Sequence, residues 1–123
     1  MKRVLIVEDQ ADIRKLIRMT LEFEPYDIHE AADGAEGLRL AATLLPDMIL
    51  LDVMMPGELD GLQVCQRVRA NPALAETRVV LLTARGQVKD RDAGDQAGAD
   101  DYLIKPFSPL QLIETIERLM PSA

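Results

Sequence analysis

The sequence predicts an α/β fold, in which five parallel strands form a doubly wound sheet with helices on both faces. Apolar runs at 4–7, 48–51 and 79–82 show no polar alternation, which is typical of strands buried on both faces. Strand and helix patterns alternate five times, and right-handed crossovers turn that alternation into a parallel sheet. A length of 123 residues suits one domain, so residues 1–123 are expected to form a single unit.

The expected strands lie at 4–7, 27–31, 48–52, 79–83 and 101–106. The second is the least hydrophobic, because polar and apolar residues are mixed in it, and this composition favours an edge position. The third carries four successive apolar residues and ends on Asp52, so it is expected at the centre of the sheet.

The first two helices are predicted from apolar spacing and from the prolines that follow them. The first begins near Ala11 and stops before Pro25, with an expected buried face of Ile13, Leu16, Ile17 and Leu21. The second begins at Asp33, whose spacing to Glu36 is that of a helix start, and an expected stripe of Leu38, Ala41, Ala42 and Leu45 precedes Pro46.

Three more helices follow. A capping-box spacing at Asp60 and Gln63 opens the third helix, and its inward residues are expected to be Leu62, Cys65 and Val68. The fourth, at about 87–97, has few apolar anchors and is expected to be the least stable. The fifth begins with a capping Ser108, and its buried face is expected to contain Leu112, Ile113, Ile116 and Leu119.

Composition limits the compartment and the partners. The formal charge of −7 argues against direct binding of nucleic acid or of an anionic membrane. The first apolar run is too short for a signal peptide or a membrane span, so a cytoplasmic location is expected. A single cysteine, Cys65, cannot form an internal disulfide and is expected to be a small buried hydrophobe.

Polar side chains follow four of the predicted strands. Glu8, Asp9, Asp52, Thr83 and Lys105 are expected to meet at one edge of the sheet, where the carboxyl ends of parallel strands form binding sites. Three adjacent carboxylates repel one another unless a cation neutralises them, and carboxylate ligation suits Mg²⁺. An ammonium group and a hydroxyl beside that ion match the needs of phosphoryl transfer. Asp52 on the central strand is then the expected oxygen nucleophile.

These residues, with several short motifs, resemble the receiver domain of two-component response regulators over the whole chain. The matching motifs are Glu8-Asp9, Asp52 followed by Met54-Met55-Pro56, Asp60-Gly61, Thr83-Ala84, and 97–102 leading to Lys105-Pro106-Phe107. The resemblance implies a CheY-like, flavodoxin-like sheet of strand order 2-1-3-4-5. It also implies that Asp52 accepts a phosphoryl group from a phosphohistidine on a histidine kinase or histidine phosphotransfer protein.

The resemblance assigns roles to individual residues. Asp9, Asp52 and the Met54 carbonyl would bind Mg²⁺ directly, and Glu8 would act through water. The phosphoryl group would contact Lys105, Thr83 and the backbone N–H of Ala84, a cis peptide bond would precede Pro106, and Thr83 and Tyr102 would move on phosphorylation.

The resemblance also predicts the output. The domain would catalyse only its own phosphorylation and dephosphorylation, so it is not expected to be an enzyme with a separate substrate. It would signal to a downstream protein through the fourth helix, the last strand and the last helix. Pairing of this face into a homodimer is left open.

Two other functional classes compete with this interpretation. A phosphohydrolase of the haloacid-dehalogenase type also uses an aspartate nucleophile, but it needs a second aspartate at the position of Met54. A flavin-binding domain of the same topology needs a Ser/Thr-rich phosphate loop after the first strand, which is absent. One departure from the family pattern is the additional residue in the stretch 57–59, which is expected to alter access to the site.

Overall fold

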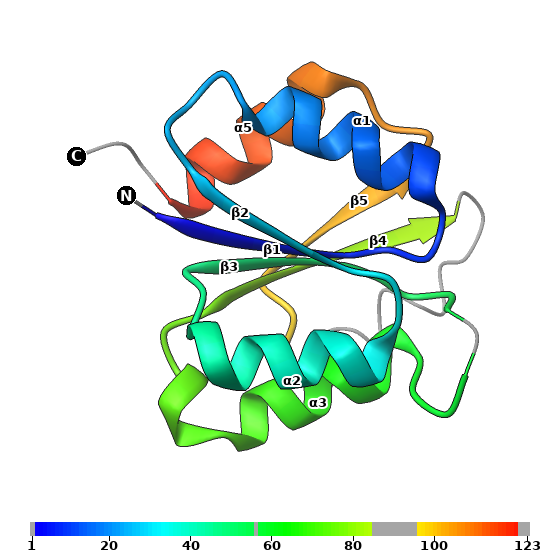
Figure 1. The fold of residues 1–123 in the computed structure, drawn as a ribbon, viewed down its shortest axis with the longest axis vertical. Helices are drawn as coiled ribbons and strands as arrows, with labels where there is room; N and C mark the ends of the chain where they lie inside the picture. The colour runs from blue at the N-terminus through cyan, green and yellow to red at the C-terminus, as the bar shows by residue number, and fades with distance from the viewer. Residues whose placement is uncertain (1, 56, 85–95, 121–123) are drawn as a thin grey trace.

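The computed structural model describes residues 2–55, 57–84 and 96–120. Its centre is one sheet of five parallel strands in the order β2-β1-β3-β4-β5, which confirms the predicted fold (Figure 1). The strands are β1 (Arg3–Val7), β2 (Asp27–Ala31), β3 (Met48–Asp52), β4 (Arg78–Ala84) and β5 (Asp101–Lys105). The mixed strand β2 is at an edge and the apolar β3 is at the centre, as the sequence predicts.

Helices cover both faces of the sheet. Figure 1 shows α1 (Ala11–Leu21) and α5 (Pro109–Leu119) on one face and α2 (Gly34–Leu44) and α3 (Gly61–Ala70) on the other. A short 3₁₀ turn, η1 (Pro72–Leu74), follows α3. The helix expected at 87–97 lies outside the described residues except for its last two, which are helical. No helix among the described residues is both long enough and apolar enough to cross a lipid bilayer.

Each face of the sheet has its own apolar layer. Alternate residues of the central strands point to opposite sides, so Ile49 and Leu51 pack toward α2 and α3, whereas Leu50 packs toward α1 and α5. Cys65 of α3 is fully buried in the first layer, as expected. Covering both faces explains why the central strands contain continuous apolar runs.

Three residues expected in the core are exposed. Leu16 of α1 is 44% exposed, because the buried side of this helix runs through Ile17, Thr20 and Leu21. Ala42 of α2 is also exposed, and Leu45 is 51% exposed. The buried side of α2 contains Gly34, Gly37 and Ala41 instead. A Cβ at Gly37 would lie 2.9 Å from Val7 of β1 and one at Gly34 would lie 2.6 Å from Leu59, so the small residues let this helix pack closely.

The helix starts follow the predicted capping chemistry. In α3 the Asp60 side chain accepts a hydrogen bond from the Gln63 N–H at 2.9 Å. The Gln63 side chain in turn accepts one from the Asp60 N–H at 3.0 Å. In α5 Ser108 and Gln111 form the same reciprocal pair. Each box satisfies backbone N–H groups that a helix end leaves without partners, so it fixes where the helix begins.

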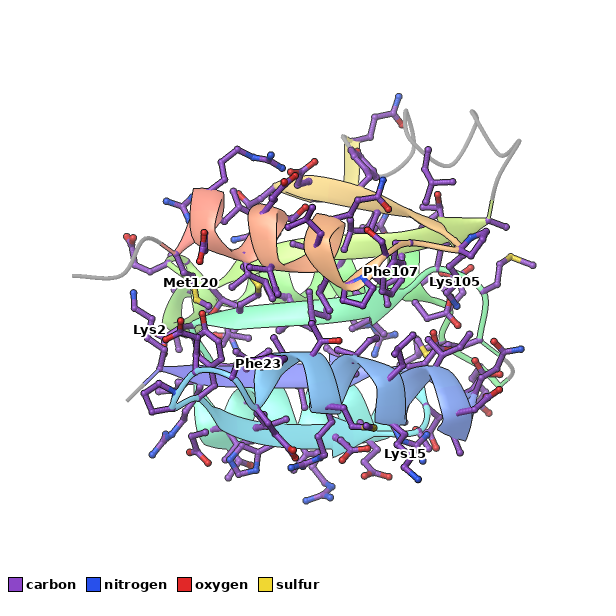
Figure 2. The ribbon with its side chains drawn as sticks, turned by 90° about the horizontal axis from the view of Figure 1, so that it is seen from above. Lys2, Lys15, Phe23, Lys105, Phe107 and Met120 are labelled. Atoms are coloured by element: carbon purple, nitrogen blue, oxygen red, sulfur yellow. The ribbon has the colours of Figure 1, made fainter. Side chains whose placement is uncertain are left out.

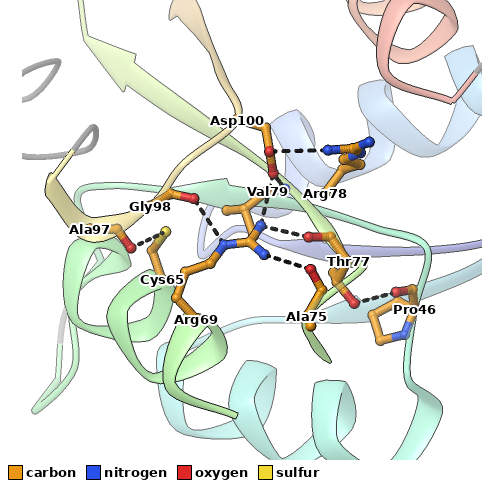
Figure 3. A network of polar contacts seen from close by, with 10 residues as sticks. All are labelled: Pro46, Cys65, Arg69, Ala75, Thr77, Arg78, Val79, Ala97, Gly98 and Asp100. Atoms are coloured by element: carbon orange, nitrogen blue, oxygen red, sulfur yellow. Dashed lines mark hydrogen bonds and ion pairs between the residues drawn. The ribbon is translucent and has the colours of Figure 1, made fainter. Parts of the chain in front are cut away.

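Arg69 ties α3 to the segment that enters β5 (Figure 3). Its guanidinium donates to the carbonyls of Gly98 and Thr77 and forms an ion pair of 2.8 Å with Asp100. Asp100 also accepts from the Val79 N–H at 2.7 Å. Gly98 has φ +94°, and a Cβ there would lie 2.5 Å from the Arg69 side chain, so glycine is required at this position.

Candidate functional site

The candidate site lies where the strands β1, β3, β4 and β5 end. Asp52 at the end of β3 pairs with Leu82 of β4, and Ala84 of β4 pairs with Lys105 of β5. Figure 2 shows Lys105 at one end of the sheet, with Lys2 and Met120 at the other. The parallel topology therefore brings residues from four separate stretches of sequence to one edge.

Three carboxylates meet at this edge. Glu8, Asp9 and Asp52 each offer an oxygen, and these three oxygens lie within 4.8 Å of one another. Glu8 is fully buried and Asp52 is only 3% exposed, whereas Asp9 is partly exposed. The cluster thus has an enclosed interior and one side that opens to solvent.

The turn between β1 and α1 holds the two acids of this cluster that are adjacent in sequence. The Glu8 N–H donates to Ala31 of β2 at 3.1 Å, and the Gln10 N–H donates to Glu8 Oε2 at 3.3 Å. The N-cap residue of α1 is Gln10, and no side chain caps this helix. The Asp9 carboxylate is therefore not used as a helix cap, although its sequence context would allow that role.

Lys105 joins two of the three acids. Its Nζ lies 2.7 Å from Glu8 Oε1 and 3.2 Å from Asp52 Oδ1. Burial acts to lower the pKa of Lys105, but the Glu8 and Asp52 carboxylates outweigh burial and hold that pKa above its ordinary value. The ammonium group therefore stays charged, and its single positive charge lies beside a cluster of three carboxylates.

Asp52 has an unusual protonation equilibrium. Burial, together with the neighbouring carboxylate of Glu8, raises the pKa of Asp52 from 3.8 to about 8. For Asp9 burial also acts to raise the pKa, but hydrogen bonds with Asp52 and Glu8 outweigh it and the pKa is lowered. The cluster thus keeps one proton near neutral pH unless a cation replaces it.

The donor set fits a divalent cation. Glu8 Oε1 is buried and, among the described atoms, has no partner in hydrogen-bond geometry despite its ion pair with Lys105. Carboxylate oxygens with a solvent-facing side are the environment that Mg²⁺ prefers, since it retains several waters. The Met54 carbonyl is the additional ligand that the family resemblance implies. The Met54 side chain is 62% exposed.

The backbone that follows Asp52 is tightly packed. The Met54 N–H donates to Asp52 Oδ1 at 3.2 Å, and the Val53 N–H donates to Leu82 of β4 at 3.0 Å. At Gly61 a Cβ would lie 2.1 Å from the Asp52 carbonyl oxygen. Residues 57–59, where the additional residue falls, border the turn between β2 and α2.

Replacing Gly61 with alanine is expected to damage the site. The Cβ cannot fit 2.1 Å from the Asp52 carbonyl, so either the end of β3 or the first turn of α3 must shift. We expect a loss of about 1–3 kcal/mol in the free energy of unfolding. Urea denaturation measures this loss. Alanine at Gln66, an exposed residue of the same helix, serves as the control.

The other predicted site residues also lie near this edge. Thr83 is buried and follows Leu82, the residue that pairs with Asp52, and the exposed Ala84 comes next. The peptide bond between Lys105 and Pro106 is cis. Tyr102 is partly buried and packs against the apolar layer on the α2 and α3 side of the sheet.

Sequence reasoning missed two features of the site. The contact of Lys105 with Asp52, which the family resemblance implies in the absence of a phosphoryl group, is present at 3.2 Å, but the shorter ion pair with Glu8 was not expected. The sequence analysis treated Gly61 only as part of a motif. It missed the close approach of Gly61 to Asp52 because this approach depends on how α3 packs. A glycine directly after a capping aspartate was a weak signal of this approach.

Comparison with known proteins agrees with this geometry. The family described as "Response regulator receiver domain" matches residues 4–117. The chain belongs to this family. Receiver domains of this kind serve two-component signalling, and the match favours the receiver interpretation over a haloacid-dehalogenase or a flavin-binding domain.

Individual relatives support the assignment. The chain is 42% identical to the DNA-binding dual master transcriptional regulator RpaA of Synechocystis over 98% of its own length and 49% of the relative. It is 43% identical to the transcriptional regulatory protein ResD of Bacillus subtilis, again over 98% and 49%. This receiver domain therefore spans about half the length of these relatives.

Solved structures show the same fold. The chemotaxis response regulator CheY4 of Vibrio cholerae matches with a TM-score of 0.90 at 33% identity, covering 98% of this chain and 99% of that one. The receiver domain of NtrX from Brucella abortus matches with a TM-score of 0.88 at 28% identity, covering 98% and 99%. Both are signalling domains with the sheet described above.

Proposed function

We propose that Asp52 is the phosphoacceptor of this receiver domain, that Asp9, Asp52 and the Met54 carbonyl bind Mg²⁺ directly, and that Glu8 binds it through water. The main support is the position of the Asp52 carboxylate, which is buried within the acid cluster and 3.2 Å from Lys105 Nζ. A buried carboxylate shared between a cation site and a lysine is suited to act as a nucleophile toward phosphorus.

The reaction breaks one bond and forms another. An oxygen of Asp52 attacks the phosphorus of a phosphohistidine, the bond from phosphorus to the imidazole nitrogen breaks, and an acyl phosphate forms on Asp52. Mg²⁺ held by the acid cluster would supply positive charge that offsets the negative charge of the phosphoryl oxygens.

The chain's own residues assist this step. Lys105 leaves the Asp52 carboxylate and binds a phosphoryl oxygen, while its ion pair with Glu8 keeps the ammonium in place. Thr83 and the Ala84 N–H bind the other phosphoryl oxygens, and both lie on the strand beside Asp52. Thr83 and Tyr102 then shift to report the phosphorylated state.

The phosphodonor we propose is a histidine kinase or a histidine phosphotransfer protein in the cytoplasm. The output surface we propose includes β5 and α5 together with the helix expected at 87–97, of which 87–95 lie outside the described residues. This surface binds a downstream protein or a second copy of this chain. In support, β5 and α5 border a surface groove of about 240 Å³, and Ile104 in this groove is 50% exposed. The net charge of −7 argues against nucleic acid as a partner of this domain itself.

The test is direct labelling with a small phosphodonor. We expect the chain to gain one phosphoryl group on incubation with acetyl phosphate and Mg²⁺, detected by intact mass. Addition of EDTA before the donor is expected to abolish labelling, because the carboxylates then repel the incoming phosphoryl oxygens. Equal labelling with and without Mg²⁺ would contradict the proposal, as would a label on a peptide that lacks Asp52.

A further inference from the structure

We propose that Arg14 is a positioning residue for the metal site, which it orients through the backbone of Glu8. This inference rests on the proposed function, because it concerns the same acid cluster. Arg14 lies one turn into α1 and does not belong to the cluster itself.

The contacts of Arg14 link three elements. Its Nη1 donates to the Glu8 carbonyl at 2.7 Å, and its Nε forms an ion pair of 3.0 Å with Glu30 Oε1 of β2. The Arg14 side chain is 21% exposed and the Glu30 side chain is 29% exposed, so the pair is partly shielded from water. Partial burial and two anchor points fix the guanidinium in one orientation.

The orientation of the Glu8 carbonyl affects the position of Asp9, the next residue of the acid cluster. It belongs to the peptide group that joins Glu8 to Asp9, so its direction fixes the position of the Asp9 Cα. The N–H of Glu8 is already tied to Ala31 of β2 at 3.1 Å. With the carbonyl bound to Arg14, Glu8 is held through both its N–H and its carbonyl, so the Asp9 backbone is held at a position from which its carboxylate lies near Asp52. Groups that orient metal ligands in this way strongly affect metal affinity.

Arg18 provides a matched comparison within the same helix. It lies one turn after Arg14 and also pairs with Glu30, through Oε2, but its other bond goes to the Ile28 carbonyl at 3.2 Å. Loss of Arg18 therefore removes the same charge and a bond to the same carboxylate, and it leaves the Glu8 carbonyl untouched. A role for Arg14 that is merely structural would be shared by Arg18.

The experiment compares Mg²⁺ affinity in the full chain and in two variants, Arg14→Met and Arg18→Met, by titration of backbone amide chemical shifts. Methionine keeps most of the aliphatic length and removes the charge. We expect the Mg²⁺ dissociation constant to rise about tenfold in Arg14→Met and less than about twofold in Arg18→Met. Thermal melting in EDTA measures the accompanying loss of stability, which we expect to be similar in the two variants.

Two further measurements separate the outcomes. In Arg14→Met the rate of labelling by acetyl phosphate should return to that of the unchanged chain at saturating Mg²⁺, because the acceptor itself is intact. Arg14→Lys, which keeps one donor, should show an intermediate dissociation constant, and it carries the comparison if Arg14→Met does not fold. Equal weakening by the Arg14 and Arg18 variants, or none by either Arg14 variant, would overturn the role of Arg14. Failure of the unchanged chain to bind Mg²⁺ would instead overturn the proposed function.

Discussion

Asp52→Asn is expected to abolish labelling of this receiver domain by acetyl phosphate. The carboxamide has almost the same shape as the carboxylate, so the fold and the neighbouring backbone are kept, but it lacks the negative oxygen that attacks phosphorus. It also removes one of three carboxylates from the cation site. Intact mass after incubation with Mg²⁺ and acetyl phosphate measures the effect, and the expected loss is complete.

Glu58→Gln is the matched control for that experiment. Glu58 is an exposed acid in the loop that follows Asp52, so the substitution makes the same change of charge near the site without touching the cluster. It should label as readily as the unchanged chain. Labelling of Asp52→Asn at the rate of this control would disprove the role of Asp52.

The sheet and most of its helices could be predicted because apolar runs and helix starts are local signals. β3 reads as a central strand from its own residues, and the capping boxes at Asp60 and Ser108 fix two helix starts. The faces of α1 and α2 were harder to predict, because exposure depends on how the helices pack. Leu16 is apolar yet exposed, whereas Gly34 and Gly37 are buried because small residues allow α2 to approach Leu59 and Val7 closely.

The members of the candidate site could be predicted, but their mutual contacts could not. Parallel strands bring their carboxyl ends together, so polar residues after β1, β3 and β5 had to be neighbours. The ion pair of Lys105 with Glu8 and the hold of Arg14 on the Glu8 carbonyl depend on side-chain rotamers and on helix placement. No periodicity or motif in the sequence encodes these two contacts.

Asp52→Asn should also make the metal-free protein more stable at neutral pH. A pKa raised from 3.8 to about 8 means that ionised Asp52 is less favourable in the folded state than in the unfolded chain, where its pKa is ordinary. The neutral asparagine avoids this cost. We therefore expect a gain of about 1–3 kcal/mol in the free energy of unfolding at pH 8 in EDTA.

The pH dependence gives this prediction its sign. Between about pH 4 and pH 8 the folded chain keeps a proton on Asp52 that the unfolded chain has lost, so the stability conferred by that proton falls as the pH rises through this window. Urea denaturation in EDTA should therefore show the unchanged chain and Asp52→Asn diverging from pH 5 to pH 8, with the variant the more stable. Saturating Mg²⁺ should reverse the order, because the cation binds the ionised cluster of the unchanged chain more strongly and stabilises the folded state. If the asparagine variant is less stable than the unchanged chain in EDTA at pH 8, then ionised Asp52 does not destabilise the folded state.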